Sequence, residues 1–127
     1  MRKYLQIKLG MEISEVNNIL GEEIKLKIKE DGYSYFNKTY GIYLYFEHKD
    51  KKLHAIGYNE LFNLSIDGFN INMHEKELRK IKGEPNYTKS IPENKVEYLI
   101  YEKSSVCYEI DTTNGKIKAI TISKENL

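Results

Sequence analysis

The sequence predicts an α+β fold: two tandem units, each a helix followed by an antiparallel meander, forming one continuous antiparallel sheet with the helices on one face. Residues 40–58 (YGIYLYFEHKDKKLHAIGY) align with residues 104–122 (SSVCYEIDTTNGKIKAITI), Lys52 falling on Lys116. Upstream, VNNILGEE at 16–23 aligns with LRKIKGEP at 78–85. Apolar and polar residues alternate in the runs that follow each segment, as expected for half-buried strands. Since neither half of such a short duplicated chain is expected to bury its apolar face alone, the halves should share one sheet.

Length and composition favour a single domain over residues 1–127, with one repeat unit at about 4–66 and the other at about 67–123. The 127 residues are 40% hydrophobic and 31% charged, which is typical of a folded globular chain. There are 20 basic and 19 acidic residues, and the sequence shows no basic stripe. We therefore expect no nucleic-acid partner, because such a partner requires concentrated positive charge.

The first unit is predicted to contain one short helix and several strands. Residues 4–9 read as a strand or extended lead-in, and helical spacing of apolar residues over 12–20 predicts a helix that Gly21 ends. Residues 24–29 alternate apolar residues with three lysines, which we interpret as a protected sheet edge. Strands are predicted at 33–37, 41–47 and 52–58, with a polar turn at 49–51 and a strand-like or linking run at 61–66.

The second unit repeats this order. A helix is predicted over 73–82, with Leu78 and Ile81 on its apolar side, and Gly83 and Pro85 end it. Residues 92–95 form a loop, and strands are predicted at 96–102, 105–111 and 116–122. The pair Asn114-Gly115 is typical of a tight hairpin turn, because both residues tolerate positive φ.

Alternation in these strands predicts two faces of different chemistry. The face toward the helices should carry Ile42, Leu44, Phe46, Val106, Tyr108 and Ile110, with Phe36 and Ile100 on the neighbouring strands. The outer face should carry the candidate partner-binding residues Tyr33, Tyr35, Tyr43, Tyr45, Leu99, Tyr101 and Glu109, together with Cys107. Eleven tyrosines with no tryptophan suit a recognition surface, although tyrosine is also a favoured residue of half-exposed strands.

No motif in the sequence indicates catalysis, a metal site or a cofactor. The three histidines, His48, His54 and His74, have no metal-binding spacing, and no phosphate-binding loop or nucleophile elbow is present. The lone Cys107 has no neighbouring histidine and suits a buried structural thiol in a reducing compartment. The start of the chain, MRKYLQIKLGMEI, lacks the apolar run of a secretory signal, and no segment is apolar enough to span a bilayer. We expect a non-enzymatic cytoplasmic protein without a membrane partner.

Gly10-Met11, then Glu15-Val16 and Leu20-Gly21, then a three-stranded meander ending in an Ala-Ile strand, resemble the tandem unit of β-lactamase-inhibitor-protein-like proteins. The outer-membrane assembly lipoproteins of the SmpA/OmlA type carry a single similar unit. In that family a Ser or Thr precedes the Glu by three residues to form a capping box. Glu12 and His74 stand at those positions here, and Asn72 replaces the glycine in the second unit, so the motif is incomplete. The resemblance implies a concave sheet, backed by helices, that grips a protein partner.

A small Lys-, Ile- and Asn-rich bacterial-type protein of this build also resembles immunity proteins, which occlude a cognate toxin domain. The sequence therefore predicts a protein-binding module, most specifically an immunity protein. Two alternatives stay open: a small-molecule or peptide-binding regulatory domain that uses the concave sheet, and a homodimer that pairs its sheets through the tyrosine face.

Overall fold

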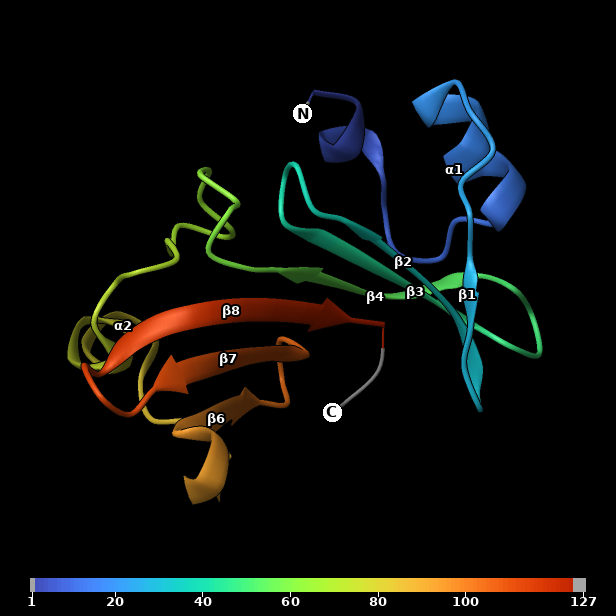
Figure 1. Cartoon of the computed structure of the whole chain (residues 1–127). Coiled ribbons are helices and arrows are strands. Elements are labelled where there is room, and N and C mark those ends of the chain that lie inside the picture. The colour runs from blue at the N-terminus through green and yellow to red at the C-terminus, as the bar shows by residue number, and fades with distance from the viewer. Residues whose placement is uncertain (1, 125–127) are drawn as a thin grey trace.

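The chain folds into one antiparallel sheet of eight strands with two short α-helices (Figure 1). The computed structural model describes residues 2–124. In chain order, the elements are the 3-10 helix η1 (Arg2–Gln6), α1 (Ile13–Leu20), β1 (Lys27–Ile28), β2 (Gly32–Asn37), β3 (Ile42–Glu47), β4 (Leu53–Tyr58), α2 (Glu75–Lys82), β5 (Tyr87–Ile91), the 3-10 helix η2 (Pro92–Asn94), β6 (Val96–Tyr101), β7 (Val106–Asp111) and β8 (Lys116–Ser123). No helix within residues 2–124 is both long and apolar enough to cross a membrane.

The predicted fold class is wrong, because the protein is mostly sheet and is not built as two tandem helix-plus-meander units. Strands account for 41% of the residues and helices for only 20%. Each α-helix has eight residues, since Gly21 and Gly83 cap them early, and all eight strands belong to one sheet. Residues 4–6 of the predicted strand or extended lead-in belong to the 3-10 helix η1, and neither residues 7–9 nor residues 61–66 contain a strand.

Both α-helices are capped by residues outside the usual Ser and Thr. The backbone N–H of Glu12, the N-cap of α1, donates to the Glu15 carboxylate at 3.2 Å, as in a capping box. At the start of α2, His74 Nδ1 accepts from the backbone N–H of Lys76 at 3.1 Å. Side-chain acceptors therefore cap both helix starts, a carboxylate at α1 and an imidazole at α2, although only α1 has a capping box.

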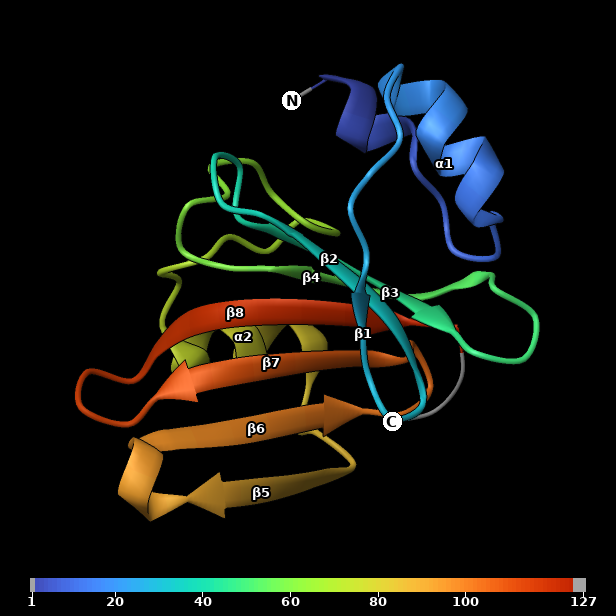
Figure 2. The same ribbon diagram turned by 45° about the vertical axis from the view of Figure 1, so that its right-hand side comes forward.

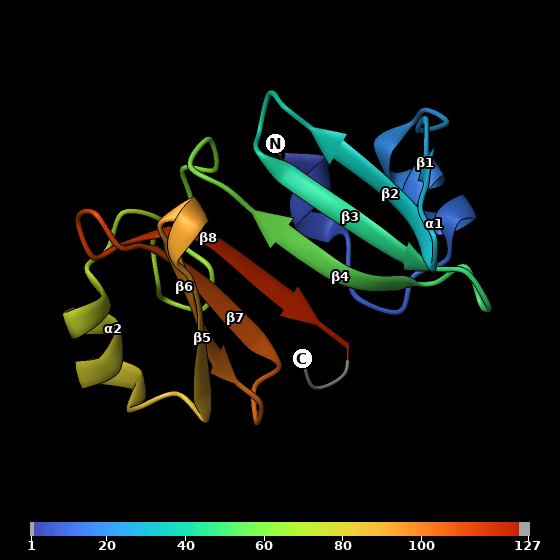
Figure 3. The same ribbon diagram turned by 60° about the horizontal axis from the view of Figure 1, so that its bottom comes forward.

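The strands follow the order β1-β2-β3-β4-β8-β7-β6-β5, so the first and second halves of the chain meet where β4 pairs with β8. That pair has four residue partners, from Ala55↔Ser123 to Tyr58↔Ile120. Figures 2 and 3 show that the sheet bends strongly along this seam. In Figure 2 α2 lies behind β7 and β8, and in Figure 3 α1 lies behind β1 and β2, each helix on the outer side of the bend. The helix-free face therefore lines the inside of the bend.

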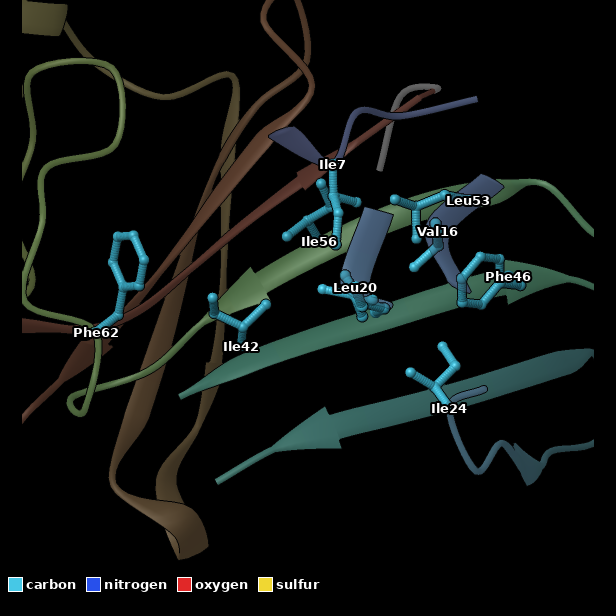
Figure 4. Packing of buried hydrophobic residues seen from close by; sticks show 10 residues of the cluster. Ile7, Val16, Leu20, Ile24, Ile42, Phe46, Leu53, Ile56 and Phe62 are labelled. Atoms are coloured by element: carbon cyan, nitrogen blue, oxygen red, sulfur yellow. The ribbon is translucent and has the colours of Figure 1, made fainter. Parts of the chain in front are cut away.

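The core lies between the helices and one face of the sheet, called here the covered face. Val16 and Leu20 of α1 pack in one cluster with Leu44, Phe46 and Ile56. Figure 4 shows Val16, Leu20, Phe46 and Ile56 of this cluster. A second cluster joins Leu78 of α2 to buried residues of β6, β7 and β8: Leu99, Tyr101, Val106, Tyr108, Ile110, Ile117 and Ile120. The register confirms that Ile42, Leu44, Phe46, Val106, Tyr108 and Ile110 belong to the covered face. Ile81, predicted on the apolar side of the second helix, is 62% exposed.

Candidate binding surface

The opposite side of the sheet, the open face, carries a row of directly paired residues that crosses both halves of the sheet. Register pairs Phe36 with Tyr43, Tyr43 with Gly57, and Gly57 with Thr121. The row continues from Thr121 to Cys107, Ile100 and Tyr87. Because side chains alternate between faces, directly opposed residues project on the same side. Seven strands thus contribute to one continuous surface inside the bend.

A small hollow lies in this row at the seam between the two halves. Its volume is about 160 Å³. Gly57 leaves the space open, since a Cβ added there would make only ordinary contacts, with Thr121 Oγ1 and Tyr43 Cβ at 3.5 Å and Tyr43 Cδ1 at 3.8 Å as the nearest atoms. Phe36, at its rim, is 48% exposed, which is high for a phenylalanine. The hollow is lined by Phe36, Gly41, Tyr43, Gly57, Tyr58, Asn59, Ala119 and Thr121.

A wider open groove of about 640 Å³ borders the hollow on the side of β1. Lys25, Lys27 and Lys29, called here the lysine edge, form one of its walls, and all three are exposed. Phe36 and Tyr43 line both the groove and the hollow. The two depressions are therefore parts of one surface, basic at the rim and aromatic toward the seam.

A third depression, near the far end of β3, is polar and fixed by internal contacts. It is lined by Asp31, Tyr45, Glu47 and His54. The Tyr45 hydroxyl donates to the Asp31 carbonyl oxygen at 3.0 Å, and His54 Nδ1 lies 3.5 Å from Glu47 Oε2. Desolvation, followed by the hydrogen bond to Asp31, raises the pKa of Tyr45 to about 12. This tyrosine is a positioned hydrogen-bonding group and is not set up as an acid or base near neutral pH.

The open face holds no arrangement that would activate a nucleophile. Burial, with a smaller contribution from the Glu109 carboxylate, raises the pKa of the Cys107 thiol to about 11. A thiol in this state is a poor nucleophile at neutral pH, because the thiolate is the reactive form. Within residues 2–124, no group of three or more His, Cys, Asp or Glu residues could hold a metal ion.

The predicted binding residues divide between the two faces. Tyr43, Tyr45 and Glu109 lie on the open face, as predicted. The other four, Tyr33, Tyr35, Leu99 and Tyr101, lie on the covered face, opposite Phe46, Leu44, Tyr108 and Val106. Conversely, Phe36 and Ile100 lie on the open face and not in the core face predicted for them. A one-residue error in phase within β2 and β6 inverts every side chain of those strands, which explains the whole set of corrections.

Two of the covered-face tyrosines, Tyr35 and Tyr101, make structural contacts through their hydroxyls. The Tyr35 hydroxyl lies 3.1 Å from the Tyr4 hydroxyl, and Asn37 Nδ2 donates to it at 3.3 Å, so η1 is tied to β2. The Tyr101 hydroxyl donates to the Gly83 carbonyl oxygen at 2.8 Å and ties β6 to the end of α2. These hydroxyls join elements of the fold.

Sequence reasoning missed Phe36, Gly57 and Thr121 as parts of the surface. Gly57 carried a usable signal, since a glycine inside an alternating strand often marks a close approach or an open space. Phe36 gave the wrong signal, because a phenylalanine beside tyrosines is normally the more buried residue.

No family model matches the chain, and no curated protein matches it. Among solved structures, a cysteine-rich secretory protein from Staphylococcus aureus has a similar fold, with a TM-score of 0.57 and 11% identical residues. The similarity covers 91% of this chain but 44% of that protein, so the chain spans less than half of its length. At this level of identity the likeness shows the fold alone.

Proposed function

We propose that the protein is a non-enzymatic protein-binding module whose partner docks on the open face. The observation that carries this proposal is a pair of aromatic side chains, exposed Phe36 and half-buried Tyr43, beside an unfilled hollow on a sheet face that no helix covers. Phe36 and Tyr43 would be the anchors, because aromatic side chains in a desolvated centre dominate most protein interfaces. Polar groups around them, among them Glu109 and the lysine edge, would set orientation and association rate.

The size of the hollow favours a protein partner over a small ligand. Sites for small molecules usually enclose about 300–1,000 Å³ and bury most of the ligand. The hollow has about 160 Å³, and the larger depression beside it is an open groove. Such a surface suits one inserted side chain within a broader contact. The alternative of a metabolite-binding domain therefore has less support.

The most specific form of the proposal is an immunity protein that occludes the active site of a cognate bacterial toxin domain in the cytoplasm. An inhibitor of this kind needs a rigid, partner-shaped surface and no chemistry of its own. The open face offers such a surface, and its titratable groups are not arranged as a nucleophile and base. Support for a toxin as the partner comes from the resemblance in sequence and not from the geometry.

Co-purification with the protein encoded directly upstream tests both levels of the proposal. The wild-type chain should bind it and should restore growth to cells that express it. A Phe36→Ala/Tyr43→Ala variant should lose both effects, whereas Tyr35→Phe, on the covered face, should retain them. Equal binding by the two variants would contradict the open face as the interface. Binding without restored growth would contradict only the immunity role.

Sedimentation of the free protein at increasing concentration distinguishes binding to another protein from self-association. If the open face instead pairs with a second copy, the free protein should sediment as a dimer, and the Phe36→Ala/Tyr43→Ala variant should be monomeric. A monomeric wild type would exclude the homodimer alternative.

A further inference from the structure

We propose that the open face recognises an acidic segment of its partner, whose carboxylates lie along the lysine edge while one apolar side chain enters the hollow over Gly57. This inference rests on the proposed function and specifies the chemistry of the partner. Three features of the surface support it: the positive charge of the lysine edge, the spacing of its lysines, and the continuity of the groove with the hollow.

The first feature is unpaired positive charge. Lys25, Lys27 and Lys29 are exposed along one wall of the groove. Among residues 2–124, the ion pairs join Arg79 to Glu75 and Glu84, and His54 to Glu47, so none involves the lysine edge. The three cations form no ion pair with described residues and present a row of positive charge on this wall, bounded along the chain by Glu23 and Glu30. A complementary partner would supply carboxylates here.

The second feature is the spacing of the charges. Lys27 lies in β1, the outermost strand beside β2, and Lys25 and Lys29 flank it at alternate positions. In extended chain, alternate residues lie about 7 Å apart and project to one side. An extended partner segment with Asp or Glu at every second position has the same repeat. Like charges oppose pairing with a second copy of this edge, so the same lysines disfavour self-association.

The third feature is the path from the lysine edge to the hollow. Phe36 and Tyr43 border both depressions, so a segment on the lysines passes directly over the rings to Gly57. A cavity of about 150 Å³ in another protein holds one benzene molecule. The hollow, at about 160 Å³, therefore has room for one leucine-sized side chain. The site is selective for an acidic segment that carries a single apolar anchor.

The remaining charges favour an acidic protein segment over a nucleic acid. A polyanion that continued along the open face would meet Glu109 and Asp111 on β7. Single-stranded nucleic acid is bound through a basic groove that follows the backbone for several nucleotides. Beyond Phe36 and Tyr43 the open face carries charges of both signs, with Lys89 of β5 in the same row as Glu109, so it offers no continuous basic path and suits a few residues of protein chain.

A synthetic peptide tests the inference on the full chain. The probe is a fluorescein-labelled, extended peptide with aspartate at alternate positions and one central leucine, and its binding is followed by fluorescence anisotropy. Two matched peptides replace either the aspartates by asparagine or the leucine by glycine, and a labelled oligothymidylate represents nucleic acid. Binding should weaken about tenfold with either peptide change. It should also fall between about 0.01 M and 1 M salt, as the Debye length shrinks from about 30 Å to 3 Å.

Matched variants locate the effect on the protein. Replacing all three lysines of the lysine edge by glutamine should weaken binding of the aspartate peptide about tenfold. Binding of the asparagine peptide should not change. The control replaces three other exposed lysines by glutamine and keeps the same net charge, so it should bind as wild type. Gly57→Val should block binding of the peptide that carries the leucine. Gly57→Ala, a smaller change, should weaken this binding and serves as the test if Gly57→Val misfolds. The control lysines are Lys76, Lys80 and Lys103.

The outcomes separate this inference from the proposed function. If the aspartate and asparagine peptides bind equally and Gly57→Val blocks both, the acidic segment is wrong but the open face remains the binding surface. If neither peptide binds, or if the lysine control weakens binding as much as the lysine edge, the inference is wrong. Tighter binding of oligothymidylate through the lysine edge would overturn it in favour of nucleic acid. If Gly57→Val binds both the peptide and the upstream protein normally, the proposed function fails as well.

Discussion

The covered and open faces of the sheet are made by the same strands but have different compositions and roles. In β3, Leu44 is completely buried on the covered face, while its neighbour Tyr43 is half-buried on the open face. The covered face is closed by α1 and α2 and holds the core clusters. The open face keeps an exposed phenylalanine and a hollow. Aromatic residues alone therefore do not mark a binding face, since tyrosines occur on both faces.

The largest expected difference between the faces is in stability. Leu44→Ala should lower the free energy of unfolding by about 2–5 kcal/mol, because it leaves a cavity among fully buried side chains. Tyr43→Ala, one residue away, should lower it by about 1 kcal/mol, since that side chain packs only along a half-exposed sheet surface. Urea denaturation of both variants measures the two changes. Equal losses would contradict the distinction between the faces.

Removing single hydroxyls sharpens the comparison among the tyrosines. Tyr35→Phe should lower the free energy of unfolding by about 0.5–1.5 kcal/mol, because it removes contacts with Tyr4 and Asn37. The Tyr43 hydroxyl makes no hydrogen bond to other described residues. Tyr43→Phe should therefore change the free energy of unfolding by less than about 0.5 kcal/mol. Thermal and urea unfolding of the matched pair provide the measurement. A larger loss of stability for Tyr43→Phe than for Tyr35→Phe would contradict the structural role assigned to the Tyr35 hydroxyl.

Filling the hollow should affect stability less and in the opposite direction. At Gly57, an added methyl group would make ordinary contacts at 3.5 Å, and the backbone does not require a glycine. Gly57→Ala should therefore raise the free energy of unfolding by about 0.4–1 kcal/mol, by reducing the entropy of the unfolded chain. A loss of stability in urea would show that the hollow is not open as described. If Gly57→Ala stabilises the protein but weakens binding to the partner, Gly57 serves binding and not stability.

The smallest effect at neutral pH is expected at Cys107. Since burial raises its folded-state pKa from 9.0 to about 11, the folded chain keeps this proton longer than the unfolded chain does. Its contribution to stability is thus fully present below about pH 9 and is lost as the pH rises through about 11. Above about pH 11, the Cys107→Ala variant should lose less of its free energy of unfolding than the wild type does. At neutral pH the two should differ little. Alkylation of the thiol should show a midpoint near pH 11, and a midpoint near pH 9 would contradict its burial.

Six of the eight strands were predictable from their strand-like composition, and the alternating run at 24–29 predicted the sheet edge where β1 lies. Residues predicted as strands at 33–37, 41–47, 52–58, 96–102, 105–111 and 116–122 agree with β2, β3, β4, β6, β7 and β8 to within a residue or two. The edge strand β5 was missed, because its residues are mostly exposed on both sides and therefore show no alternation. The 3-10 helix η1 was mistaken for a strand or extended lead-in, since spaced apolar residues in so short a segment fit both structures.

The binding surface was less predictable than the strands. In β2, the sequence Tyr-Ser-Tyr-Phe offers apolar bodies in both phases, and only the pairing of Phe36 with Tyr43 decides which phase faces the helices. In β6, Ile100 and Leu99 create the same ambiguity. The hollow depends on the meeting of β4 with β8, and no local pattern reports that long-range contact.

Amide NMR of the chain bound to its partner protein tests the central claim most directly. If the open face is the interface, the largest changes in chemical shift should fall on Tyr43, Gly57 and Thr121, in β3, β4 and β8. The exposed sides of α1 and α2 should change little. Changes confined to the two helices, with the three open-face residues unaffected, would contradict the claim.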